Sequence, residues 1–336
     1  MADKANTQKP DMKYVVLLVS LVILGSCFGN LSQTALNSMF TGMAQDFGVD
    51  AGVGQWVTTL YMLVSGITVP AVTYLMRRFE LKKVILASLV LLVLGGVIDA
   101  AALNFPMLIA GRVLQAISAG ITMPMMMSLI MTSVPSDRQA TAMGISGIAM
   151  GFAPNIGPTI GGWMLEATGW RSFFVVLAIC SMVLTVIALF AIRKTPAEDC
   201  GMRLDVLSLC QSALGFGGLL VGFSNASSYG PGSPFVWLPV IAGAVFLVFF
   251  MRRQRRVDYP LIHLEILNSR QYCVSFWASN FLYASFMGIT LIIPLYIENL
   301  CGGSAFMAGL ALLPGTIAAF VINPLAGILT DKIGAR

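Results

Sequence analysis

Residues 147–163 read GIAMGFAPNIGPTIGGW, an uncharged stretch in which glycine or proline recurs every three or four residues. Glycines remove side chains from the surface of a helix, while prolines remove backbone N–H donors and favour a bend. Small residues let helices approach closely in lipid, where van der Waals packing largely replaces the hydrophobic effect. The stretch therefore predicts a bent, closely packed helix, acting either as a hinge or in packing alone. Its glycines are Gly147, Gly151, Gly157, Gly161 and Gly162, and its prolines are Pro154 and Pro158.

Apolar runs long enough to cross a bilayer flank this helix on both sides. Hydrophobic residues make up 57% of the 336 residues and charged residues 10%, whereas a soluble domain carries about 25% charged residues. A helix needs about 20 apolar residues to cross the hydrocarbon core, and its backbone groups must bond internally at that depth. We expect an all-α membrane protein with ten spans, at residues 14–36, 54–76, 83–103, 106–132, 139–165, 171–192, 205–225, 234–251, 272–298 and 305–330.

Basic residues mark one side of the membrane. When the segments between the expected spans are assigned alternately to the two sides, 18 of the 20 Lys and Arg residues fall on one side. The exceptions are Arg171, at the end of a span on the opposite side of the membrane, and Arg112, inside a span. Because cytoplasmic loops carry the excess of basic residues, we expect a multi-pass protein of the plasma (inner) membrane with a cytoplasmic N-terminus at residues 1–13. Such loops face lipid headgroups, so nucleic-acid binding is not expected.

Few residue types suited to catalysis or metal binding are present. The six cysteines are scattered without a C-x-x-C pair, and His263 is the single histidine. These features argue against a disulfide framework and a multi-histidine metal site. The sequence shows no acid/base pair, nucleophile–histidine pair or phosphate-binding loop. An enzyme, a metal site and a bound cofactor are therefore not expected.

An internal repeat links the ends of spans two and ten. The four matching pairs are each separated by 254 residues. A six-helix bundle, two intervening helices and a second bundle would place the second copy of span two at span ten. We therefore expect a fragment or a C-terminally truncated product that holds only the first two helices of the second bundle. The pairs are Pro70 and Pro324, Leu75 and Leu329, Arg78 and Lys332, and Lys82 and Arg336.

Four segments resemble the fourteen-spanner drug:proton antiporters of the major facilitator superfamily. The most specific is residues 147–163, which is similar to the antiporter motif of that family. The others are RVLQAISAG at 112–120, the loop LMRRFELKK at 75–83 with its echo GILTDKIGAR at 327–336, and LALLPG at 310–315. The resemblance covers residues 14–336 and implies a major facilitator fold. Its parts would be a six-helix bundle at 14–193, a two-helix hairpin with its flanks at 194–256 and the start of a second bundle at 257–336.

Arg112 lies about two turns inside span four. A basic residue near the bilayer centre costs about 2.5–3.5 kcal/mol on insertion scales, so it is expected to face protein or water. In the family, the matching arginine is implicated in proton transfer. The alternative is a structural bridge between spans, with Asp99 as its partner.

The basic loop after span two resembles the family's cytoplasmic gating loop, which latches the two bundles together. Arg78, Lys82 and Lys83 match it, but Arg77 stands at the aspartate position and Glu80 at the usual glycine. A loop that only sets membrane topology is the alternative for this copy. The second copy is closer to the family pattern, with Asp331, Lys332, Gly334 and Arg336.

Span one carries a single polar stripe on an otherwise apolar helix. Such a stripe is expected to line a substrate path, or alternatively to hold neighbouring helices by hydrogen bonds. The family usually has an aspartate in this segment where Ser32 stands. Serine does not carry a proton at physiological pH, so this position predicts a departure from the family's usual form of proton coupling. The stripe consists of Asn30, Gln33, Thr34 and Asn37.

Two further groups complete the candidate site. Met123 and Met127 belong to a methionine-rich part of span four, which suits a promiscuous apolar surface or simple packing. Asp99 and Glu298 are the remaining acids within or at the edge of spans, and both are expected near the outer face and in contact with solvent.

These features predict export of drugs or other small amphipathic molecules by alternating access. Arg112 and a carboxylate would couple transport to protons, and residues 147–163 would act as hinge and seal. The alternatives are an uncoupled or differently coupled permease and a truncated membrane component without transport activity. The expected partners are the lipid bilayer, a small-molecule substrate and protons, while substrate identity and oligomeric state stay open.

Overall fold

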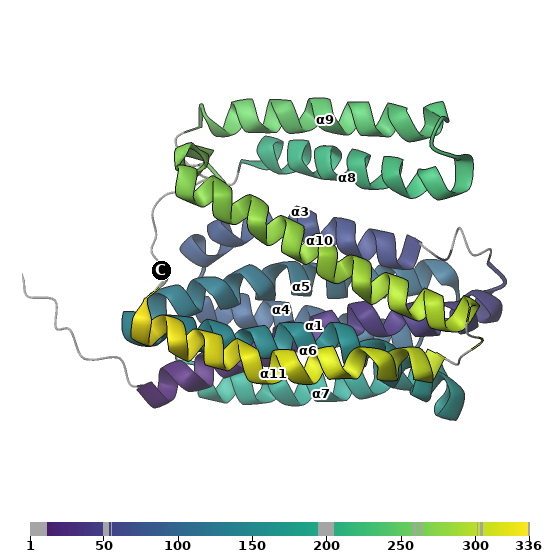
Figure 1. Cartoon of the computed structure of the whole chain (residues 1–336), viewed down its shortest axis with the longest axis horizontal. Coiled ribbons are helices and arrows are strands. Elements are labelled where there is room, and N and C mark those ends of the chain that lie inside the picture. The colour runs from purple at the N-terminus through teal and green to yellow at the C-terminus, as the bar shows by residue number, and fades with distance from the viewer. Residues whose placement is uncertain are drawn as a thin grey trace, which may run out of the picture.

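The computed structural model is α-helical throughout the part of the chain that it describes (Figure 1). This part comprises residues 12–49, 54, 56–193, 205–257, 260–261, 264–300, 302 and 305–334. Its long helices are α1 (Met12–Phe47), α3 (Trp56–Arg78), α4 (Leu81–Ala100), α5 (Phe105–Ser133), α6 (Gln139–Thr168), α7 (Trp170–Ala191), α8 (Val206–Tyr229), α9 (Pro234–Gln254), α10 (Arg270–Asn299) and α11 (Ala305–Ile333). Two short 3₁₀ helices, η1 (Ser136–Arg138) and η2 (Leu264–Asn268), lie in the connections.

A long helix occupies each stretch for which the sequence predicts a span. Within the described residues, eight of these helices are long and apolar enough to cross a membrane. Helices α6 and α10 are not among these eight. Eight spans are therefore supported, and crossing by α6 and α10 stays a prediction.

The first helix is longer than the span expected at residues 14–36. It continues for three further turns to Phe47, since the end of an apolar run does not end a helix. Asp46 near this end accepts hydrogen bonds from Trp170 Nε1 at 2.8 Å and Arg171 Nη1 at 3.0 Å. The bond from Trp170, followed by that from Arg171, holds the pKa of Asp46 below its usual value. These contacts fix the end of α1 to the start of α7.

Helix α1 runs through the centre of the first bundle and contacts α3, α4, α5, α6 and α7. Buried apolar side chains form two cores along it. One core gathers around residues 15–22 of α1 and 121–130 of α5, and the other around residues 35–43 of α1 and 170–177 of α7. The middle of α1 therefore lies between two apolar cores.

Helices α8 and α9 form an antiparallel pair beside α3 (Figure 1). They approach closely because Gly218 and Gly243 face each other's backbone and leave no room for a Cβ atom. Asp205 at the start of α8 pairs with Arg253 at the end of α9, with Nε and Oδ2 2.8 Å apart. Gln254 also donates a hydrogen bond to the Ser208 hydroxyl at 2.8 Å. Polar contacts thus fasten one end of an otherwise apolar hairpin.

The last two helices have largely exposed side chains. Helix α11 packs along α6, and α10 crosses obliquely in front of the bundle in Figure 1 and contacts α11. This arrangement is compatible with the expected division at residues 193 and 256, which stays a prediction.

Candidate functional site

Arg112 is fully buried where α5 passes α1. Its Nη1 donates hydrogen bonds to Ser32 Oγ at 2.7 Å, to Ser32 O at 3.3 Å and to Gln115 Oε1 at 2.6 Å. The Ser32 hydroxyl in turn donates to Gln115 Oε1 at 2.6 Å. Ser32 and Gln115 are themselves fully buried. A closed polar network therefore joins α1 and α5 between the two apolar cores.

Tyr61 of α3 completes the surroundings of the guanidinium group. The Arg112 Cζ lies 4.4 Å from the centroid of the Tyr61 ring, within the range of a cation–π contact. The Tyr61 hydroxyl donates to the carbonyl oxygen of Gly29 at 2.8 Å. Tyr61 thus links α3 to α1 and covers the arginine with an aromatic face.

Asp99 is also fully buried, which corrects the expectation that it meets solvent near the outer face. The last turn of α4 packs against α5, where Gly111 leaves room for the Asp99 carboxylate that a Cβ atom would occupy. Asp99 interacts electrostatically with Arg112. Neither carboxylate oxygen has a hydrogen-bond partner among the described residues, and the same holds for Arg112 Nε and Nη2. The site therefore holds a buried carboxyl group and a buried guanidinium group that interact but are not joined by a hydrogen bond.

The polar stripe of α1 divides between two roles. Thr34 donates to the carbonyl oxygen of Ala153 on α6 at 3.0 Å, and Asn30 Nδ2 donates to Ser26 O of its own helix at 3.1 Å. Gln33 is half-buried, and the side chain of Asn37 lies outside the described residues. At Thr34 the structure favours the alternative of a contact between helices, whereas Gln33 stays a candidate for the substrate path.

The glycines of α6 bring this helix against both of its neighbours. Gly157 faces Thr34, and Gly161 faces the carbonyl oxygen of Ala35, each without room for a Cβ atom. On the α11 side, Gly147 faces Asn323, with its virtual Cβ 3.4 Å from Nδ2. Close packing accounts for Gly157 and Gly161, whereas a Cβ at Gly147 would make ordinary contact. A Cβ at Gly162 would make ordinary contact with Ser38, while one at Gly151 would meet open space, and the side chain of Pro154 lies outside the described residues. Pro158 is half-buried.

The two copies of the basic loop, at residues 75–83 and 327–336, differ in what they contact. Asp331 Oδ1 accepts a hydrogen bond from the backbone N–H of Ala140 at 3.0 Å, so the end of α11 caps the start of α6. In the first copy, Lys82 Nζ donates to Leu189 O of α7 at 2.7 Å, and Lys83 pairs with the nearby Glu80 at 3.0 Å. The first copy therefore has contacts within its own bundle, while the second reaches from α11 to α6. Arg78 ends α3, Lys332 lies in the last turn of α11, and Arg336 is outside the described residues.

The remaining candidates lie apart from the arginine network. Met123 is exposed, and Met127 is half-buried and packs against the core around residues 15–22 of α1. The side chain of Glu298 lies outside the described residues. Substrate contact by either methionine stays a prediction.

Sequence reasoning missed Tyr61 and did not assign a role to Gln115. Ser32 entered only as a residue unable to carry a proton, yet its hydroxyl both accepts from Arg112 and donates to Gln115. The available signal was the i, i+3 spacing of Arg112 and Gln115, which places both on one face of α5. Tyr61 had no such signal, because its partners belong to other helices.

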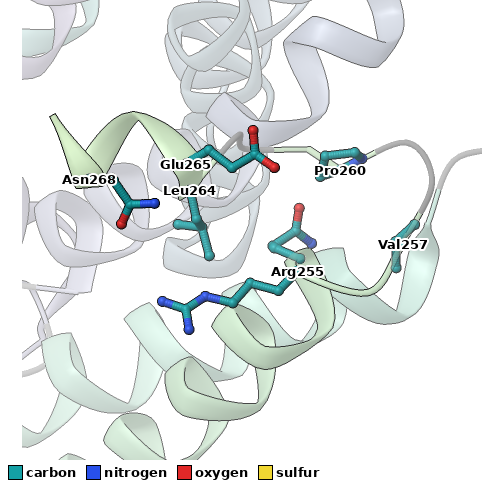
Figure 2. A pocket seen from close by; sticks show the side chains of 7 residues that line it. Arg255, Val257, Pro260, Leu264, Glu265 and Asn268 are labelled. Atoms are coloured by element: carbon teal, nitrogen blue, oxygen red, sulfur yellow. The ribbon is translucent and has the colours of Figure 1, made fainter.

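A cavity of about 670 Å³ lies where α9 ends and η2 begins (Figure 2). Figure 2 shows Arg255 and Glu265 among the side chains around it. This cavity contains none of the residues predicted for the site. Its lining comprises Gln254, Arg255, Val257, Pro260, Leu264, Glu265 and Asn268.

Known transporters are similar in sequence to nearly the whole of this chain. The lincomycin resistance protein LmrB of Bacillus subtilis (strain 168) is 34% identical over 334 residues, covering 98% of this chain and 69% of LmrB. The uncharacterized MFS-type transporter YhcA of the same organism is 34% identical, covering 99% of this chain and 62% of YhcA. The chain thus spans about two thirds of the length of these relatives. A multidrug resistance protein B homolog of Mycobacterium tuberculosis is 26% identical over 330 residues, covering 97% of this chain and 61% of that protein.

The fold has a counterpart among solved structures. The proton:xylose symporter XylE matches with a TM-score of 0.63 and 12% identity, covering 96% of this chain and 70% of the XylE chain. At that identity the likeness concerns the fold alone. The Major Facilitator Superfamily model matches residues 22–336. Together with the helical bundle and its relatives, this match shows that the chain belongs to the Major Facilitator Superfamily of membrane transporters.

Proposed function

We propose that this chain exports drugs or other small amphipathic molecules by alternating access. The observation that carries the proposal is the buried network of Arg112, Ser32 and Gln115. A charged side chain within a span is costly and is retained where it serves a substrate or ion path. The names of the relatives, lincomycin resistance and multidrug resistance, support efflux as the direction.

The contact between α6 and α11 would form part of the seam between the two moving bundles. Gly144 of α6 faces the carbonyl oxygen of Asn323 on α11 without room for a Cβ atom, and Asp331 binds the first turn of α6 at one end of the same contact. Alternating access requires that such contacts form and break without leaving side chains in the way. A glycine, which has no side chain to obstruct the movement, and the single cap by Asp331 allow this contact to form and break. We further place the chain in the fourteen-spanner branch, with ten spans and a cytoplasmic N-terminus, on the strength of its basic loops and its antiporter motif.

A differently coupled or uncoupled permease is the second candidate. It is favoured by Ser32, whose hydroxyl does not carry a proton at physiological pH. A protonophore separates the two candidates, because it abolishes proton-driven accumulation and leaves downhill flux in place.

The proposal is tested in a host that lacks its own drug pumps. Cells producing the chain should accumulate less ethidium and tolerate more lincomycin than cells producing Arg112→Ala at the same membrane level. Equal ethidium content and equal lincomycin tolerance in both strains would contradict export through this site.

A further inference from the structure

Asp99 and Arg112 face each other across the contact between α4 and α5 without bonding. Both side chains are fully buried, and they interact electrostatically. Both oxygens of Asp99 and the Nε and Nη2 of Arg112 have no hydrogen-bond partner among the described residues. Buried polar groups in proteins are nearly always paired, so unbonded carboxyl and guanidinium atoms on adjacent helices point to an interaction that forms in another state.

The charged neighbours of Asp99 are few. On α5 the neighbour is Arg112, and Tyr61 of α3 lies behind that arginine. From α7, Arg171 reaches the Ala102 carbonyl at 3.1 Å, but its guanidinium also binds Asp46. From α1 the nearest member of the network is Ser32, which carries no charge. Within the described residues, Arg112 is therefore the cation that responds to the charge of Asp99.

Arg112 has two sets of acceptors around it, because the Asp99 carboxylate lies against Gly111, the residue before it in α5. In the present arrangement its Nη1 is bound to Ser32 and Gln115, and its other nitrogens are unpaired. A buried carboxylate without a bonded partner is strongly disfavoured, so this arrangement fits an Asp99 that holds a proton. An ionised Asp99 would instead draw the guanidinium toward α4, since a charge-assisted hydrogen bond is stronger than one to a neutral acceptor.

We propose that Asp99 is the proton-carrying group of this site and that Arg112 switches between Asp99 and Ser32. When Asp99 is protonated, Arg112 binds Ser32 and ties α5 to α1. When Asp99 releases its proton to water, the guanidinium pairs with the carboxylate and the bond to Ser32 breaks. The proton on Asp99 thereby decides whether Arg112 ties α5 to α1, while the bond from Ser32 to Gln115 does not depend on it. This inference rests on the proposed transport function and supplies its coupling residue.

The close approach of α4 and α5 favours the exchange of Arg112 between Ser32 and Asp99. Gly95 of α4 faces the Gly111 carbonyl and the Gln115 side chain, and Gly111 of α5 faces the Asp99 carboxylate. Neither position has room for a Cβ atom. The two glycines thereby place the carboxylate directly against the turn of α5 that carries Arg112, so the exchange of partners needs movement of the guanidinium side chain alone.

The first test measures the proton itself and does not require transport. The full chain in lipid nanodiscs is titrated while the infrared C=O stretch of protonated carboxyl groups is recorded. We expect a band that disappears as the pH rises and that is missing in Asp99→Asn. Asp46→Asn, which changes an exposed acid at the end of α1, should keep the band. A band that persists unchanged in Asp99→Asn would overturn the proposal.

The second test measures coupling in everted membrane vesicles with an acidified interior and ethidium as the probe. Asp99→Asn should lose proton-driven accumulation while ethidium still equilibrates down its gradient. Adding Ser32→Asp to Asp99→Asn should restore accumulation, because the Ser32 hydroxyl lies 2.7 Å from Arg112 Nη1 and a carboxylate there meets the same guanidinium. Full pumping by Asp99→Asn would refute the assignment. If no variant, wild type included, moves ethidium, the proposed function fails, while the infrared result still decides the role of Asp99.

Discussion

Asp331 and Thr141, 190 residues apart in the chain, are joined by two hydrogen bonds. The Asp331 Oδ2 accepts from the Thr141 backbone N–H at 2.7 Å and from its hydroxyl at 2.5 Å. Because Thr141 lies in the first turn of α6, a carboxylate from α11 occupies the position that a local N-cap residue would fill. A negative charge there is also favoured by the positive end of the helix dipole. One side chain thus stabilises α6 and fastens it to α11.

Replacing Asp331 with alanine should lower the stability of the chain. The variant removes the cap at the start of α6 and also frees α11 from α6. The thermal unfolding midpoint in detergent measures the effect. Asp137→Ala is the matched control, since that acid lies beside the same helix start but is 73% exposed and 3.8 Å from Arg138. Equal shifts of the unfolding midpoint in both variants would show that the contact of Asp331 with α6 does not stabilise the chain.

Gly161→Ala should weaken the packing of α6 on α1. The added methyl group would collide with the backbone of Ala35, which has no flexible end to move aside. Overpacking of this kind costs about 1–3 kcal/mol. Gly151→Ala is the control, because a Cβ there meets nothing within 4 Å. Thermal unfolding of the two variants should differ by several degrees, and a Gly161→Ala protein as stable as Gly151→Ala would contradict the packing described.

Ser32→Ala should cost more than the same change at Ser88. Both serines are fully buried, but the Ser88 hydroxyl binds only Ile85 O of its own helix at 2.8 Å, whereas Ser32 serves Arg112 and Gln115. Hydrogen bonds between transmembrane helices contribute about 0.6–2 kcal/mol. Comparison of unfolding in denaturant gives the difference. A larger loss of unfolding free energy in Ser88→Ala than in Ser32→Ala would contradict a stabilising role for the Ser32 network.

The Asp205–Arg253 pair should make stability depend on pH in the acid range. The hydrogen bond from Arg253, with support from Ser208, lowers the pKa of Asp205 to about 2. A carboxylate whose pKa falls on folding stabilises the folded state above its unfolded pKa of about 3.9, and this contribution is lost as the pH falls toward the folded value. Wild type should therefore unfold at a higher temperature than Asp205→Asn at neutral pH.

The difference between wild type and Asp205→Asn should shrink as the pH falls from about 4 toward about 2. Asparagine still accepts a hydrogen bond at the start of a helix, so this substitution isolates the charge. Glu80→Gln, which alters the exposed pair with Lys83, should show little effect at any pH. A gap between wild type and Asp205→Asn that stays constant down to about pH 2 would contradict the pairing.

The helices and the family were within reach of sequence reasoning, because apolar length and motif spacing are local properties. Each predicted span lies on a long helix, although α1 extends past Leu36 to Phe47. The resemblance drawn from residues 147–163 to the major facilitator superfamily is confirmed at the level of the superfamily. The number of spans and the fourteen-spanner branch stay predictions.

The site was less accessible to the sequence, since burial depends on which helices meet. Asp99 was expected in solvent from its place near the end of an apolar run, and this prediction was wrong. The glycines at positions 95 and 111 bring α4 and α5 together and enclose the carboxylate. Tyr61 was missed for a similar reason, because its ring meets Arg112 only after α3 and α5 pack. Long-range contacts of this kind leave no periodic signal in one chain.

Site-directed labelling tests most directly whether these helices cross a bilayer with their basic ends in the cytoplasm. In a cysteine-free background, Gly232→Cys between α8 and α9 and Arg255→Cys after α9 are treated with a membrane-impermeant maleimide; both positions are exposed. We expect Gly232→Cys to react in intact cells and Arg255→Cys to react only after the membrane is opened. Labelling of Arg255→Cys from outside, or a purified chain that is monomeric and soluble without detergent, would contradict the account.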